Sequence, residues 1–187
     1  MNKENFFASV RTSLFGGTLT TKQVEGMEAI IDYWETKEIE NDRQLAYILA
    51  TAYHETDKKM EAIEEYKKGR GKPYGKNIKH NGTRYNDVPF FYYGRGLVQL
   101  TWYENYVLMG RILGIDLLKN PELALELDIA VKILVEGMIR GSFTGRKLSQ
   151  YFNKKTLSIS ARAIINGSDC DRLISGHYRK FLTALSA

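Results

Sequence analysis

Apolar residues recur at three- and four-residue steps along much of the chain, which is the spacing of one face of an α-helix. This periodicity predicts helices over about 5–15, 21–34, 42–60 and 171–185. The segment 129–139 is apolar nearly all round and predicts a buried central helix, which Asp128 could cap. Asn120-Pro121 predicts one more helix start, because proline is favoured in the first turn.

The helical pattern stops in the middle of the chain. Gly, Lys, Pro, Asn and Thr dominate about 69–86, which predicts an irregular, exposed insertion. The β-prone runs 90–93 and 97–102 flank Gly94-Arg95-Gly96, so a small β-hairpin is expected there. Core-forming helices lie on both sides of the insertion. The sequence therefore predicts one mainly α domain (α+β class) over 1–187.

Composition narrows the class of protein. A chain of 187 residues with 43% hydrophobic residues suits one compact unit, or two lobes around a cleft. The net charge of +5 favours anionic partners, but the Lys and Arg residues follow no groove-facing stripe, so no nucleic-acid binding is expected. Cys170 is the single cysteine, which excludes an internal disulfide. No apolar run approaches the length of a membrane span, and 1–17 has no secretory-signal pattern.

Glu55 continues an apolar stripe. In the helix predicted from Asp42 to about Met60, Ile48 and Ala52 lie seven and three residues before Glu55 on the same face. A carboxylate there would lose hydration and would lie near the negative end of the helix dipole. Both effects favour an acid that keeps its proton near neutral pH. The alternative is a glutamate that turns to the helix edge and stays in water.

Three further carboxylates, Glu61, Glu64 and Glu65, follow closely. Hydrolysis of a glycosidic bond with inversion needs two carboxyl groups about 6.5–9.5 Å apart. Along a straight helix, a residue nine or ten positions further on would lie roughly 14 Å away on another face. The helix must therefore end near Met60 and fold back if Glu64 or Glu65 is to face Glu55. A solvated charge run among the neighbouring lysines is the alternative.

Other chemistries find little support. His54-Glu55 begins like a zinc-protease motif, but Lys58 occupies the position of the second histidine ligand. With three histidines and one cysteine, neither a closed metal site nor a cofactor is expected. His54 is predicted to be structural, bonding to the backbone beside Glu55. The chain has no Gly-x-Ser-x-Gly elbow and no phosphate-binding loop.

Several segments together resemble glycoside hydrolase family 19, which contains chitinases and many phage endolysins. These segments, in chain order, are His54-Glu55-Thr56, Tyr92-Tyr93-Gly94-Arg95-Gly96-Leu97-Val98-Gln99-Leu100-Thr101, Asn105-Tyr106, Gly114-Ile115-Asp116-Leu117-Leu118, Asn120-Pro121 and Ile164-Ile165-Asn166-Gly167. Their order and approximate spacing agree from about Leu45 to Arg179. The resemblance implies a lysozyme-like, two-lobed helical fold with a cleft.

The resemblance also implies roles for individual residues. Glu55 matches the general acid, and Thr101 matches a hydroxyl that holds the nucleophilic water. Four positions match sugar-contacting or water-ordering residues, namely Tyr93, Gln99, Asn105 and Asn166. Arg95 is expected to brace the hairpin with Tyr93, and Arg172 to steady the second carboxylate. Phage members resemble a Met-x-x-Ile/Val-x-Glu pattern, which selects Glu65 as the second carboxylate, with Glu64 as the alternative.

Compared with plant-type chitinases, this sequence lacks the disulfide cysteines, has a shorter spacing between its two carboxylates and has trimmed cleft loops. The resemblance then implies a monomeric phage-type endolysin that cleaves β-1,4 bonds of peptidoglycan by inversion. Such an enzyme would be made in the host cytoplasm and would act on the cell wall, with a separate membrane-permeabilising protein (a holin) giving access. A bacterial chitinase and a catalytically inactive wall-binding module are the alternatives.

Overall fold

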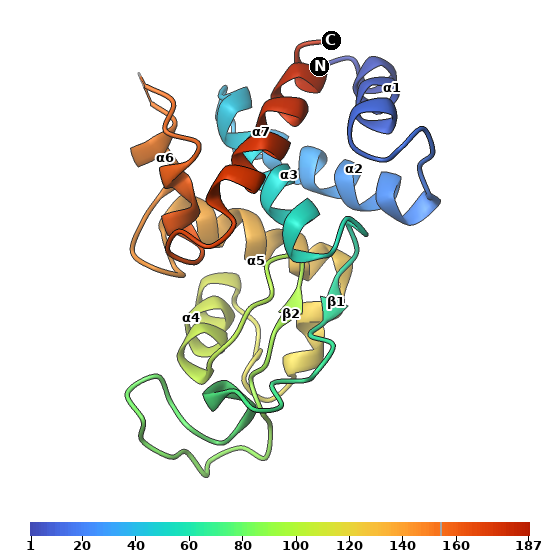
Figure 1. The fold of residues 1–187 in the computed structure, drawn as a ribbon. Helices are drawn as coiled ribbons and strands as arrows, with labels where there is room; N and C mark the ends of the chain where they lie inside the picture. Colours follow the sequence, from blue (N-terminus) through green and yellow to red (C-terminus); the bar gives the residue numbers. More distant parts are fainter. Residues whose placement is uncertain (154) are drawn as a thin grey trace.

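The chain folds as a mainly helical protein with one small sheet (Figure 1), in a computed structural model that describes residues 1–153 and 155–187. The α-helices are α1 (Lys3–Ser13), α2 (Thr21–Glu35), α3 (Asp42–Glu55), α4 (Tyr103–Leu113), α5 (Leu127–Arg140), α6 (Leu148–Tyr151) and α7 (Asp171–Leu185). The 3-10 helices are η1 (Pro73–Gly75), η2 (Pro121–Leu125) and η3 (Ser160–Ile164), and the strands are β1 (Ile63–Glu64) and β2 (Arg95–Gly96). The predicted fold class is confirmed.

Side-chain caps define where the first helices begin. Thr20 and Gln23 form a reciprocal capping box at the start of α2. The Asn41 side chain accepts a hydrogen bond from the backbone N–H of Gln44 at the start of α3. The predicted starts of these two helices are thus confirmed, but α3 ends at Glu55, earlier than the predicted end near Met60.

The core is built around α3. Helix α3 packs along α7 and also contacts α2 and α5 (Figure 1). From Gln44 to Tyr53 every residue of α3 is buried, and α5 is buried from Val131 to Met138 except at Lys132. The predicted buried central helix is confirmed as α5, although Glu126 rather than Asp128 is its N-cap. A buried carboxylate on α5, Glu136, joins this helix to α2 through Tyr33.

The predicted small hairpin forms, since the N–H of Trp102 donates to the carbonyl of Tyr92 at 2.8 Å and Arg95 pairs with Leu100, but its turn is shifted and a further strand pairs with it. β1 and β2 are antiparallel, with Ile63 opposite Gly96 and Glu64 opposite Arg95. The chain reverses after Arg95, whose backbone exchanges two hydrogen bonds with Leu100, of 3.2 and 2.9 Å. The expected turn at 94–96 was therefore wrong. The reversal follows instead from left-handed backbone at Gly96 (φ 83°) and Gln99 (φ 51°), a conformation that glycine adopts without strain.

Two further segments also depart from the sequence prediction. Helix α4 was not predicted, and the start expected at Asn120-Pro121 opens the 3-10 helix η2 rather than an α-helix. The insertion at 69–86 is irregular, as predicted, with η1 and an isolated bridge between Ile78 and Arg84. Among the helices described, none combines the length and the apolar character that crossing a bilayer requires.

Candidate active site

Glu55 is the last residue of α3, where the chain leaves the helix and turns sharply. Thr56 stabilises this exit, because its hydroxyl donates to the carbonyl of Ala52 (2.8 Å) and accepts from the N–H of Met60 (2.9 Å). Asp57, Lys58 and Met60 all have positive φ, between 50° and 67°. The helix therefore ends and the chain folds back toward β1, as a pair of facing carboxylates requires.

A buried arginine holds the Glu55 carboxylate. Nη1 of Arg162 lies 2.6 Å from Oε1 of Glu55, and their side chains are only 4% and 15% exposed. Nε of Arg162 donates to the carbonyl of Asp169 at 2.9 Å, so the guanidinium is fixed from both sides. Arg162 comes from η3, and sequence reasoning missed it. A single cation within Ala161-Arg162-Ala163-Ile164-Ile165 was the available signal.

The arginine changes the expectation for Glu55. Burial and the helix end were expected to keep this acid neutral, but that expectation included no cation, and Arg162 Nη1 donates to Glu55 Oε1 at 2.6 Å. Glu55 is also neither in bulk water nor at a free helix edge. The arrangement leaves Oε1 engaged with Arg162 and places the side chain on the wall of a cavity.

That cavity has a volume of about 480 Å³ and gathers residues from distant parts of the chain. Five of the predicted site residues line it together, namely Glu55, Gln99, Thr101, Asn105 and Asn166. Tyr74, His80, Trp102 and Arg162 line it as well. A polar cavity with a carboxylate, a hydroxyl and amide side chains matches the chemistry expected of a sugar site.

Gln99, which was expected to contact sugar or order water, is hydrogen-bonded to the backbone. Its Nε2 donates to the carbonyls of Ile63 (3.0 Å) and Gly96 (3.1 Å), which uses both amide protons. Its Oε1 lies against Gly94, where an added Cβ would come within 2.8 Å. Gln99 therefore ties β1 to the 96–99 turn, and only its Oε1 can interact with a ligand.

Thr101 and Asn105 form a second polar edge of the cavity. Nδ2 of Asn105 donates to the carbonyl of Thr101 at 2.9 Å. The Thr101 hydroxyl has no hydrogen-bond partner in the described parts of the chain and is half-buried. It can therefore bind a water molecule, the role that the resemblance gives it.

Glu64 and Glu65 have different surroundings, because consecutive side chains of an extended strand point to opposite sides. Glu64 accepts from Tyr93 Oη and pairs with Lys68 Nζ, each at 2.8 Å. Hydrogen bonds from Lys68 and Tyr93 lower the pKa of Glu64. Glu65 accepts from Tyr74 Oη and from the N–H of Gly94, each at 3.2 Å.

Neither carboxylate lines the cavity directly, but Glu65 is hydrogen-bonded to a residue that does, Tyr74. Glu64 is neutralised by Lys68, whereas Glu65 pairs with no cation in residues 1–153 and 155–187. This geometry favours Glu65 over Glu64 as a group that accepts a proton near the cavity.

Arg95 and Tyr93 hold β2 in place. The buried Arg95 side chain donates to the carbonyl of Phe91 (3.2 Å) and to Tyr106 Oη (3.1 Å). Its guanidinium lies 3.8 Å from the centre of the Tyr93 ring. The structure therefore places Tyr93 in this support and not on the cavity wall, where a sugar contact was expected.

Two other predicted residues lie away from the cavity. His54 is half-buried, and over the described residues its side chain makes no hydrogen bond to the backbone, contrary to expectation. Arg172 is exposed at the start of α7 and forms no ion pair with Glu64 or Glu65. Arg95 and Lys68 lie beside Glu64 instead. No group of three or more His, Cys, Asp or Glu side chains in the described chain could hold a metal ion.

Comparison with known proteins adds an independent finding. A family profile described as Chitinase class I matches residues 35–135. Basic endochitinase B of Arabidopsis thaliana is 62% identical over 32 residues, covering 17% of this chain and 10% of that protein. Inactive chitinase-like protein 1 of Hevea brasiliensis is 59% identical over 32 residues, with the same two coverages. These matches span about a tenth of the curated relatives' length.

A solved structure matches over the whole chain. A crystal structure of a chitinase C mutant has a TM-score of 0.66, covers 100% of this chain and 93% of that one, and is 22% identical in sequence. This likeness supports the fold. Glu55, Glu65, Gln99, Thr101 and Asn105 fall inside the range of the family profile, whereas Arg162 and Asn166 lie beyond it.

Proposed function

The chain belongs to the class I chitinase family, glycoside hydrolase family 19, and from this premise we propose that it is an endolysin of the lysozyme type. It hydrolyses β-1,4-glycosidic bonds of bacterial peptidoglycan. One observation carries the proposal: Glu55, held by Arg162, shares a cavity wall with Thr101, and Glu65 is hydrogen-bonded to Tyr74 of the same wall.

Glu55 acts as the general acid. Arg162 holds Oε1, so Oε2 is the oxygen that carries the proton to the glycosidic oxygen. The bond between that oxygen and the anomeric carbon then breaks, and the leaving sugar departs as an alcohol. Arg162 also stabilises the carboxylate that remains after the proton has left, which lowers the cost of the transfer.

Glu65 acts as the general base. The Thr101 hydroxyl holds a water molecule, Glu65 takes one proton from it, and the oxygen bonds to the anomeric carbon from the face opposite the leaving group. The configuration inverts without a covalent intermediate. The hydrogen bonds from Tyr74 Oη and Gly94 N–H keep the base oriented.

Two polymers, peptidoglycan and chitin, contain the β-1,4 bond that the proposed site cleaves. The short connection between the two carboxylates, the trimmed loops and the positive charge support peptidoglycan. Chitin is the second candidate, because the matched relatives are named endochitinases. Release of reducing ends from purified peptidoglycan and from chitin oligomers separates the two. Mass spectrometry of the wall fragments identifies the cleaved bond.

An inactive wall-binding module is the alternative outside the enzyme class, and the match to an inactive relative gives it a specific basis. It predicts binding to purified sacculi with no fall in turbidity. Under our proposal turbidity falls. The enzyme acts as a monomer that is made in the host cytoplasm and reaches the wall through a holin.

A further inference from the structure

The positive charge of the chain is concentrated in one segment. Seven of the 27 Lys and Arg residues lie between Tyr66 and Asn86, where no Asp or Glu occurs. The rest of the chain then carries 20 Lys and Arg against 22 Asp and Glu, so it is slightly acidic. We call residues 66–86 the basic arm. The net charge of +5 is therefore a property of this arm and not of the whole surface.

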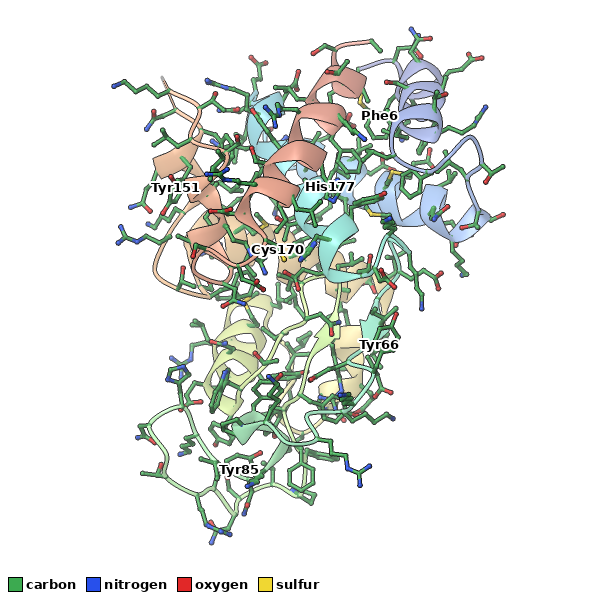
Figure 2. All side chains as sticks on the ribbon, viewed as in Figure 1. Phe6, Tyr66, Tyr85, Tyr151, Cys170 and His177 are labelled. Carbon is green, nitrogen blue, oxygen red and sulfur yellow. The ribbon has the colours of Figure 1, made fainter. Side chains whose placement is uncertain are left out.

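The basic arm is fixed to the protein beside the cavity. Tyr74 and His80 line the cavity, and their rings lie 5.7 and 4.6 Å from the ring of Trp102. The backbone N–H of His80 donates to Glu104 Oε1 at 2.8 Å. Tyr85 (Figure 2) is buried, and its hydroxyl donates to the carbonyl of Phe90 at 2.9 Å. These contacts hold the arm in place along one side of the cavity.

Most of its cations have no acidic partner. Lys68 pairs with Glu64, and Lys79 lies 4.7 Å above the ring of Tyr103. The other five cations are exposed and form no ion pair within the described chain, namely Lys67, Arg70, Lys72, Lys76 and Arg84. Like charges so close together repel each other. Such an arrangement is stabilised when an anionic ligand lies across it.

We propose that the basic arm binds the carboxylates of the stem peptides that project from a peptidoglycan strand lying in the cavity. The inference rests on the proposed peptidoglycan substrate and adds a determinant of its recognition. Peptidoglycan carries peptides with free carboxylates, whereas chitin is uncharged along its length. Arg and Lys side chains bind carboxylates through charge-assisted hydrogen bonds. The arm therefore selects the charged polymer, and the cavity itself holds the sugars that both polymers share.

The test is cosedimentation of the full chain with purified sacculi, before and after their carboxylates are amidated with carbodiimide and an uncharged amine. The arm variant carries Arg70→Gln, Lys72→Gln and Lys76→Gln together. An exposed ion contact usually changes an equilibrium constant by about two- to fivefold. We expect the arm variant to bind untreated sacculi about tenfold more weakly than the unmodified chain at low salt. On amidated sacculi the two should bind equally.

A matched control removes the same charge elsewhere, through Arg11→Gln, Arg111→Gln and Arg179→Gln, which are exposed and lie outside the arm. This control should bind untreated sacculi within about twofold of the unmodified chain. Equal binding of the arm variant and the unmodified chain to untreated sacculi overturns the inference. A loss that persists on amidated sacculi also overturns it, because wall phosphates or neutral groups would then be the ligand.

Turnover measured in the same samples separates this inference from the proposed function. If the unmodified chain digests the wall while the arm variant binds equally well, the arm inference fails and the function stands. If binding depends on the arm and on the carboxylates but no fragments appear, the function fails and the recognition of carboxylates stands.

Discussion

Nη1 of Arg162 lies 2.6 Å from Oε1 of Glu55, and this contact joins two residues that are 107 positions apart in the sequence. It connects η3 to the end of α3 across the cavity wall. The pair fixes the orientation of the proposed acid before any substrate binds. The roles of the two residues can be tested separately, because Glu55 is proposed to transfer a proton and Arg162 to position Glu55.

Glu55→Gln tests the proposed acid. The amide cannot donate a proton as an acid does, so we expect hydrolysis of peptidoglycan to fall by about 10²–10⁴-fold while the fold is retained. Turbidity of purified sacculi and circular dichroism measure the two quantities. Glu61→Gln is the matched control, because Glu61 is also half-buried and does not line the cavity. A Glu55→Gln protein with more than about a tenth of the original activity would exclude the role.

Arg162→Met tests the buried ion pair. Removing the guanidinium leaves the Glu55 carboxylate with 15% exposure and no cation at its side, and we expect a loss of about 2–4 kcal/mol in the free energy of unfolding. Chemical denaturation measures it. Glu55→Gln combined with Arg162→Met should recover part of that loss, since the uncompensated charge is gone. Strict additivity of the two single effects would show that the pair is not coupled.

The surroundings of Glu64 and Glu65 predict which of the two is needed for hydrolysis. We expect Glu65→Gln to lower hydrolysis by about 10²-fold or more, because it removes the proposed base. Glu64→Gln should lower it less than about tenfold, because Glu64 pairs with Lys68 and bonds Tyr93, away from the cavity wall. Initial rates on the same sacculi measure both. The reverse order would assign the base to Glu64.

Low pH should reduce the stability of the fold, because Glu136 becomes protonated. Burial raises the pKa of this carboxyl, but hydrogen bonds from Lys37, Arg140 and Tyr33 outweigh burial and lower the pKa to about 2, from 4.5. The unfolded chain therefore binds this proton first as pH falls, and stability present above pH 4.5 is lost between about pH 4.5 and 2. We expect this group to contribute about 3 kcal/mol of that loss.

Denaturation curves at several pH values measure the effect. Glu136→Gln has no proton to bind in this range, so its stability should vary less with pH than that of the unmodified chain. The same dependence on pH in both proteins would mean that other carboxylates are responsible for the loss in acid.

Gly26→Ala tests the support of the turn after Glu55. A Cβ at Gly26 would lie 1.8 Å from the carbonyl oxygen of Met60, so α2 and the turn must separate. We expect a loss of about 1–3 kcal/mol in stability and a fall in activity, because the turn sets the positions of both carboxylates. Gly176→Ala in α7 is the control, since nothing lies within 4 Å of an added Cβ there. If both variants behave alike, the close approach at Gly26 has no consequence.

Local patterns in the sequence account for much of the fold. The apolar stripes of α2, α3 and α5 depend on neighbours within a few residues, so periodicity reveals them. β1 has only two residues, too short for an alternating pattern to appear. The reversal at 96–99 depends on the positive φ of Gln99, which a non-glycine residue does not signal.

Prediction of the site from the sequence was limited in the same way. Glu55 faces a cavity because of its position on the helix, which the sequence pattern indicated. The resemblance to family 19 selected Thr101 and Asn105, and both line the same cavity. The partner of Glu55 could not be found in this way, because Arg162 reaches it only through tertiary packing. The resemblance offered Arg172 as a cation for the second carboxylate, but the start of α7 leaves that side chain in solvent.

The pairing of β1 with β2 closes the base of the segment 66–93, since Ile63 is opposite Gly96 and the N–H of Glu65 donates to the carbonyl of Gly94 at 2.7 Å. Insertions or deletions beyond this closure leave unaltered the strand pairing that positions Glu65. Within that segment Tyr74 must be retained, because it orients Glu65, but the length and charge around it can diversify. The proposed polymer preference can then change while the proposed acid and base stay in place.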